Sequence, residues 1–113
     1  MKLDIQFRGL QTSTALRHHA ERKLHASLSR FGQRIRTVEV RIGDVNGPKG
    51  GEDKYCRVTL ESPLGTVSVC KGAEDPYAAV HLAVDRLERA MARKLERARS
   101  LRRRQRHAPR LAS

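Results

Sequence analysis

Apolar residues near the carboxyl end of the chain recur at every third or fourth position. Between residues 74 and 104 they are Tyr77, Val80, Val84, Leu87, Met91, Leu95 and Ala98. At about 100° per residue, these positions form one stripe of an α-helix. Arginines form a second stripe roughly opposite the first, at Arg86, Arg89, Arg93, Arg97 and Arg104. The pattern predicts a helix that packs through one face and presents guanidinium groups on the other.

A second helical pattern covers residues 14–31. Its apolar residues are Leu16, Ala20, Leu24, Leu28 and Phe31. Thr12 or Ser13 can cap the first turn through a side-chain oxygen, and Gly32 suits the position just beyond the last turn. We therefore expect an amphipathic helix that ends at Phe31.

Four segments alternate between apolar and polar residues, which is typical of strands with one buried face. They cover residues 3–8, 35–42, 55–61 and 66–71. Residues 46–51 read Asn-Gly-Pro-Lys-Gly-Gly and predict a long flexible hairpin loop. Residues 62–65 read Ser-Pro-Leu-Gly and predict a tight turn.

The elements follow in the order β-α-β-β-β-α. This order predicts the α+β class, with a four-stranded sheet and two helices packed on one of its faces. It resembles the order of a double-stranded-RNA-binding domain. A chain of 113 residues is long enough for one domain, to which we assign residues 1–101. Residues 102–113 are basic, contain Pro109 and are expected to form a disordered tail.

Positive charge is concentrated at the carboxyl end. The chain has 24 Lys and Arg against 12 Asp and Glu, and residues 86–113 carry +9 of its net charge of +12. Such a localised field attracts polyanions. Nucleic acid is the leading partner, because each neutralised phosphate releases condensed counterions. An anionic membrane surface is the rival, but the later helix has no Trp or Phe to anchor it in a bilayer, so no membrane partner is expected.

The sequence also indicates where the protein resides. No segment is long and apolar enough to span a bilayer, and the first residues lack the apolar core of a secretion signal. We expect a cytoplasmic protein, whose thiols stay reduced. Alternation places the sulfur atoms of Cys56 and Cys70 on opposite faces of the sheet, although a bulge at the turn could reverse this. A disulfide between them is therefore disfavoured.

No catalytic arrangement stands out, because nothing places a nucleophile beside a base or pairs two carboxylates. The histidines have no cysteine or carboxylate to complete a metal site. The glycine-rich loop lacks the Gly-Lys-Ser/Thr ending of a phosphate-binding loop, although Lys49 and Lys54 can touch RNA at its periphery. Tyr77 is interpreted as core packing. We expect no enzyme, cofactor, metal or small-molecule substrate.

The element order and one motif together resemble the hibernation-promoting factor and ribosome-associated inhibitor family. Residues 75–80 read Asp-Pro-Tyr-Ala-Ala-Val, similar to the family's D-x-Y-x-A-I-D segment that opens the last helix. His81 stands where the family has its second Asp. The loop and strand over residues 46–56 also look like one branch of the family. The resemblance covers the chain to about residue 100.

This resemblance implies a ribosome hibernation factor. Such proteins bind the small ribosomal subunit between its head and body, against ribosomal RNA. They cover the messenger and transfer-RNA sites and inhibit translation as a stress response of idle cells. The resemblance covers no second domain of the kind by which the long form of the family pairs ribosomes, so it implies that the protein is the short form.

The candidate RNA-binding residues lie on both predicted helices. Arginine suits this role because its planar guanidinium can bind two phosphate oxygens at once. The later helix carries its cations where family members have Lys or Arg, whereas an ordinary solvated face is an equal alternative for the earlier helix. The candidates are Arg22, Lys23, Arg30, Arg86, Arg89, Arg93, Lys94 and Arg97.

Two alternatives to the ribosome hypothesis remain. The chain can be a general RNA-binding module, for which free duplex RNA would be an adequate partner. It can also dock its basic helix on an acidic protein. Affinity for isolated duplex RNA, compared with that for small subunits, distinguishes the general RNA-binding module. A complex that survives nuclease treatment distinguishes the acidic protein partner.

Overall fold

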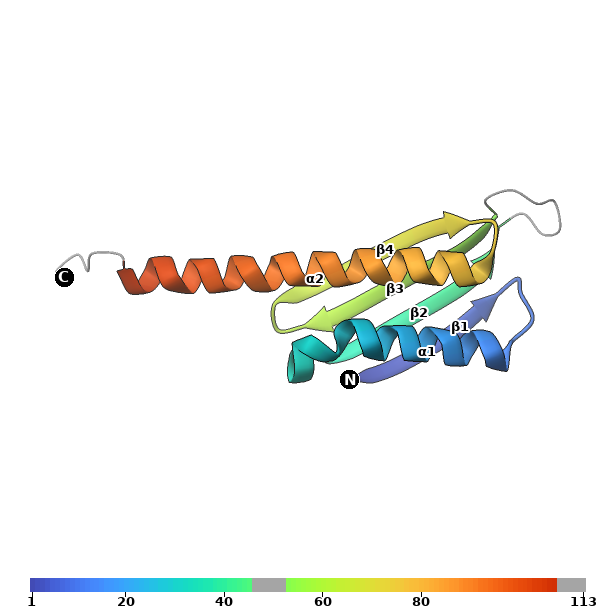
Figure 1. Ribbon diagram of the computed structural model, residues 1–113, viewed down its shortest axis with the longest axis horizontal. Coiled ribbons are helices and arrows are strands. Elements are labelled where there is room, and N and C mark those ends of the chain that lie inside the picture. The colour runs from blue at the N-terminus through green and yellow to red at the C-terminus, as the bar shows by residue number, and fades with distance from the viewer. Residues whose placement is uncertain (46–52, 108–113) are drawn as a thin grey trace.

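Four strands form one sheet in the order β1-β2-β3-β4, and two helices cover one of its faces (Figure 1). The computed structural model describes residues 1–45 and 53–107. The strands are β1 (Lys2–Arg8), β2 (Thr37–Asp44), β3 (Lys54–Ser62) and β4 (Gly65–Ala73). The helices are α1 (Thr14–Leu28), the short 3₁₀ helix η1 (Ser29–Arg34) and α2 (Pro76–His107). The predicted α+β fold and its element order are confirmed.

The sheet is mixed, because β1 runs parallel to β2 while β3 and β4 continue as antiparallel hairpins. Its register aligns apolar residues across the strands in rows, such as the row formed by Leu3, Val38, Leu60 and Val67. Alternation along each strand turns these rows to the same face. That face meets the buried residues of both helices and forms the hydrophobic core.

The first helix begins as predicted and ends earlier. Ser13 is its N-cap, since the Leu16 backbone N–H donates to Ser13 Oγ at 3.1 Å. The predicted end at Phe31 is wrong, because α-helical geometry stops at Leu28 and the chain continues as η1. Phe31 is buried within η1, and Gly32 turns the chain with a φ of 57°, a conformation that strains residues with a Cβ.

The two β-hairpin connections differ. The backbone N–H of Val45 donates to the carbonyl of Asp53 at 2.8 Å, and Lys54 Nζ lies 3.1 Å from Asp53 and 3.2 Å from Asp44. The hydrogen bond to Asp53 is the main reason that the pKa of Lys54 is raised. The predicted loop at 46–51, with Lys49, lies outside the described residues. The predicted tight turn is present as a two-residue connection between Ser62 and Gly65.

The second helix is longer than predicted. Asp75 caps it, because the Tyr77 backbone N–H donates to the Asp75 carboxylate at 3.3 Å and Pro76 occupies the first turn. The prediction of disorder from residue 102 is wrong for residues 102–107, which continue α2. Arg and Gln are good helix formers, and no Gly or Pro interrupts α2 after its first residue. Residues 108–113 lie outside the described residues.

Three side chains bear on predictions made for the core and the cysteines. Tyr77 is 37% exposed and meets the ring of His19 edge-on, with centroids 5.0 Å apart, so the prediction of core packing is wrong for it. Cys56 is buried and Cys70 is exposed, and both thiols are free. The predicted placement of these sulfurs on opposite faces is confirmed. Burial raises the pKa of the Cys56 thiol to about 12, which leaves it unreactive near neutral pH.

Candidate nucleic-acid interface

A row of exposed arginines runs along the solvent side of α2. We call it the arginine stripe, and it consists of Arg86, Arg89, Arg93 and Arg97. The buried residues of α2 recur with the same spacing of three and four, so packing of the core holds the stripe outward. Within residues 1–45 and 53–107, none of the four guanidinium groups has a hydrogen bond or an ion pair. The stripe is therefore free to bind an external anion.

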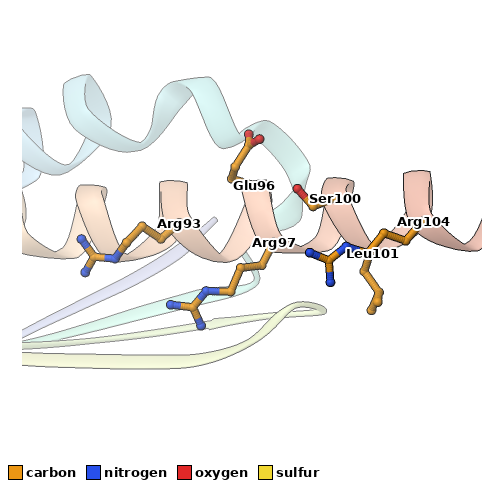
Figure 2. Close-up of a pocket in the computed structure, with 6 residues that line it drawn as sticks. All are labelled: Arg93, Glu96, Arg97, Ser100, Leu101 and Arg104. Carbon is orange, nitrogen blue, oxygen red and sulfur yellow. The ribbon is translucent and has the colours of Figure 1, made fainter.

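Further arginines extend this surface toward the carboxyl end of α2. Figure 2 shows Arg93, Arg97 and Arg104 along one side of α2, with Glu96 projecting toward α1. One shallow hollow is lined by Arg93, Glu96, Arg97, Ser100, Leu101 and Arg104. Arg104 was part of the predicted arginine pattern but not of the candidate site. The helical pattern over residues 74–104 predicts this alignment, and α2 continues beyond it to His107.

The candidate cations of α1 are in a different situation, because two of them face α2 and meet its carboxylates. Lys23 Nζ lies 2.9 Å from Asp85, and Arg30 Nε lies 3.8 Å from Glu88. The Arg30 guanidinium also lies over the ring of Phe31, 4.8 Å from its centroid. Only Arg22, which is exposed, has no ion pair among the described residues.

These ion pairs divide the predicted site. Lys23, Arg30 and their carboxylate partners form a largely neutralised seam between α1 and α2, which we call the ion-pair seam. The arginine stripe borders this seam, because Arg89 follows Asp85 by one turn and Arg30, Asp85, Glu88, Arg89 and Arg93 line one hollow, so the seam's carboxylates lie between the two sets of cations. The structure therefore brings the α2 arginines together, but it does not join them to Lys23 and Arg30 in one unbroken positive surface.

His81 joins the ion-pair seam. Its Nε2 lies 3.2 Å from Asp85, one turn along α2, where the resemblance leads one to expect a carboxylate at position 81. The cap at Asp75 forms without it. The hydrogen bond from Lys23 is the main cause that lowers the pKa of Asp85, with His81 and Arg89 contributing through their charges.

Replacing Asp85 with Asn tests the seam. The folded state depresses the pKa of this carboxyl, so its stabilising effect is present above the ordinary value of 3.8 and is lost as pH falls below it. At pH 7 the variant should lose at most about 1 kcal/mol of unfolding free energy, as expected for a partly exposed pair. Urea unfolding at several pH values should show the difference from the parent chain closing in acid. A difference that persists unchanged at low pH would contradict this account.

Lys94 projects toward the sheet instead of joining the stripe. Its Nζ donates to the carbonyl of Leu64 at 3.4 Å, and the side chain lies against Gly65 in the β3–β4 turn. Lys54, a possible peripheral contact, is likewise held by Asp44 and Asp53. Both cations have protein partners, which lowers their value as anion ligands.

The uncovered face of the sheet provides a contrast. Its charges are mixed: the described residues there include Asp4, Glu39, Arg41 and Arg57, which line one shallow hollow. Arg41 and Arg57 are direct neighbours across β2 and β3. The single-signed field that favours a polyanion thus belongs to α2, and the open sheet face offers exposed cations for control variants.

In the part of the chain that the structure describes, no three His, Cys, Asp or Glu side chains gather in a group that could hold a metal ion. In the same residues, no helix is both long and apolar enough to cross a membrane.

Comparisons with known proteins agree with the fold. Residues 3–99 match the family described as Sigma 54 modulation protein / S30EA ribosomal protein. A ribosomal subunit interface protein from Coxiella burnetii has a similar structure, with a TM-score of 0.72 and 22% identity, covering 82% of this chain and 96% of that one. The N-terminal domain of Protein Y from Thermus thermophilus gives a TM-score of 0.67 and 27% identity, with 82% and 98% covered. No curated protein sequence shows significant similarity to the chain.

Proposed function

Because the chain belongs to the Sigma 54 modulation protein / S30EA ribosomal protein family, we propose that it binds the small ribosomal subunit and inhibits translation by covering the messenger and transfer-RNA sites. Membership confirms the resemblance drawn from residues 75–80. It places the chain among ribosome-associated binding proteins and not among enzymes. The observation that carries the finer proposal is the arginine stripe, which is exposed, single-signed and unpaired among the described residues.

The proposed contact is one between guanidinium groups and ribosomal RNA phosphates. The stripe extends from Arg86 to Arg97, about 16 Å along the helix at 1.5 Å per residue, so it can meet several phosphates in succession. Each guanidinium can bind two phosphate oxygens. Such contacts position a protein without reading base sequence. Specificity then comes from the shape of the subunit groove that accepts the domain.

Inhibition follows from occupancy. The sheet and both helices form one body with a shared core, so the domain fills space as a rigid unit. A domain held between the head and the body of the small subunit excludes messenger and transfer RNA from the same space. This mechanism needs no catalytic group and no cofactor. It also predicts a location in the cytoplasm, where ribosomes work.

The proposal is tested by comparing affinities for isolated small subunits, isolated large subunits and a free RNA duplex. We expect small subunits to bind at least about tenfold more tightly than either competitor, with affinity falling steeply as salt rises. Added protein should inhibit translation in a cell-free system in proportion to the occupancy of small subunits. Equal affinity for the free duplex would instead favour the general RNA-binding module, and a complex that survives complete nuclease digestion would favour an acidic protein partner.

A further inference from the structure

The last part of α2 projects beyond the body of the domain. Figure 1 shows the helix continuing past the sheet and α1, and the molecule measures 66 Å along its longest axis against 24 and 19 Å across. Lys94 donates to the β3–β4 turn, and Arg99 lines a hollow together with Phe31. After Arg99, the polar contacts in the described chain are internal to α2, from Arg103 to Glu96 and Ser100. We call residues 99–107 the terminal arm.

The terminal arm carries arginine on two opposite faces. At about 100° per residue, Arg104 continues the line of Arg93 and Arg97. The remaining arginines lie on the other side of the helix, the side that packs against α1 nearer the body. We call them the second arginine face: Arg99, Arg102, Arg103 and Arg106, all exposed.

The placement of arginines on both faces of the arm indicates which class of partner it binds. Within the arm, Arg102 and Arg106 are one turn apart, so their like charges repel along the helix until an anion separates them, whereas Arg103 already meets Glu96 at 3.5 Å. A membrane surface requires one apolar face and one basic face. Leu101 is the single large apolar residue among residues 99–107, and it is 55% exposed. An acidic protein would dock on one side only.

We propose that the terminal arm is a second RNA-binding element, which enters a crevice between ribosomal RNA backbones and contacts phosphates on both of its faces. The inference rests on the proposed function, and it adds a contact that the domain body does not make. Apart from Arg99 itself, the arm lies beyond the residues that match the family, 3–99. Phosphates on both sides of the arm offset the repulsion between its arginines. The arginines that bind these phosphates are not part of the hydrophobic core.

The test uses three variants of the full chain that each remove four cations and lower the net charge from +12 to +8. The arm variant carries R99Q, R102Q, R103Q and R106Q. The stripe variant carries R86Q, R89Q, R93Q and R97Q. The control carries K2Q, R8Q, R41Q and R57Q, all exposed on the open sheet face. Dissociation constants for isolated small ribosomal subunits are measured over a range of salt concentrations, after circular dichroism has confirmed that each variant is folded.

We expect the arm variant to bind at least about tenfold more weakly than the control. The slope of its affinity against salt should be shallower by roughly 0.7–0.9 for each phosphate that the arm no longer neutralises. An arm variant that matches the control in affinity and salt slope would overturn the inference. That result, together with a weakened stripe variant, would leave the proposed function standing. If the parent chain shows no preference for small subunits, the proposed function fails and the inference fails with it.

Discussion

Replacing both Arg89 and Arg93 with glutamate should weaken binding to small ribosomal subunits by at least about a hundredfold, because repulsion between like charges at an interface costs several kcal/mol. The change puts two carboxylates at the centre of the arginine stripe, where we expect RNA phosphates to lie. Both side chains are exposed and have no hydrogen bond or ion pair in the described chain, so the fold loses little. The added strain is repulsion of the glutamate at position 89 with Asp85 and of the glutamate at position 93 with Glu96, each pair about one turn apart and worth a few tenths of a kcal/mol.

Co-sedimentation with isolated small subunits measures the effect. The matched control reverses Arg41 and Arg57, which are exposed neighbours on the open sheet face. Both double variants have the same net charge, so a general loss of attraction would weaken them equally. We expect the control to retain most of the parent affinity. If the stripe variant co-sediments like the parent chain, the stripe is not the binding site.

Replacing Leu87 with Ala should lower the free energy of unfolding by about 3–4 kcal/mol, through lost burial and the cavity that remains. Leu87 is fully buried on the face of α2 that meets the sheet. A loss of this size is a large part of the total for a small domain, which is typically about 5–15 kcal/mol. We therefore expect reduced thermal stability and a lower denaturation midpoint in urea.

Leu82 provides the control on the same helix. It is 46% exposed, five residues before Leu87, so its replacement with Ala removes the same atoms from a largely solvated position. The expected cost is below about 1 kcal/mol. Equal losses for the two variants would mean that α2 does not pack on the sheet through its Leu87 face. Neither variant touches an arginine, so subunit binding by the folded fraction should stay unchanged in both.

Much of the fold was predictable because its signals are local. Alternation over residues 35–42 identifies a strand, and the spacing of Val80, Val84, Leu87 and Met91 identifies the buried face of α2. The ends of elements were less predictable. Phe31 fits the helical spacing and is buried, but it reaches the core from a 3₁₀ turn. The end of α2 is hard to predict because a dense basic composition is typical of disordered tails, while Arg and Gln also favour helices.

The candidate site was predictable only in part. The arginine stripe follows from the period of α2 itself, so position along the sequence was sufficient to group its members. The pairing of Lys23 with Asp85 joins residues on different helices. No local pattern reveals such a pairing, because it depends on the way that α1 lies beside α2 over the sheet. The same limit applies to Lys94, whose partner Leu64 lies 30 residues earlier in the chain.

The unbroken course of α2 has a consequence for how the protein can be seated. Its 32 residues form a rod of about 48 Å without a hinge. The tip near His107 lies about 27 Å from Arg89 along this axis, so a tilt of roughly 10° at the stripe displaces the tip by about 5 Å. A rod anchored at two such distant points accepts a narrow range of orientations. A change in the angle between the walls of the groove on the small subunit would therefore release the protein, even if every phosphate remained within reach of an arginine.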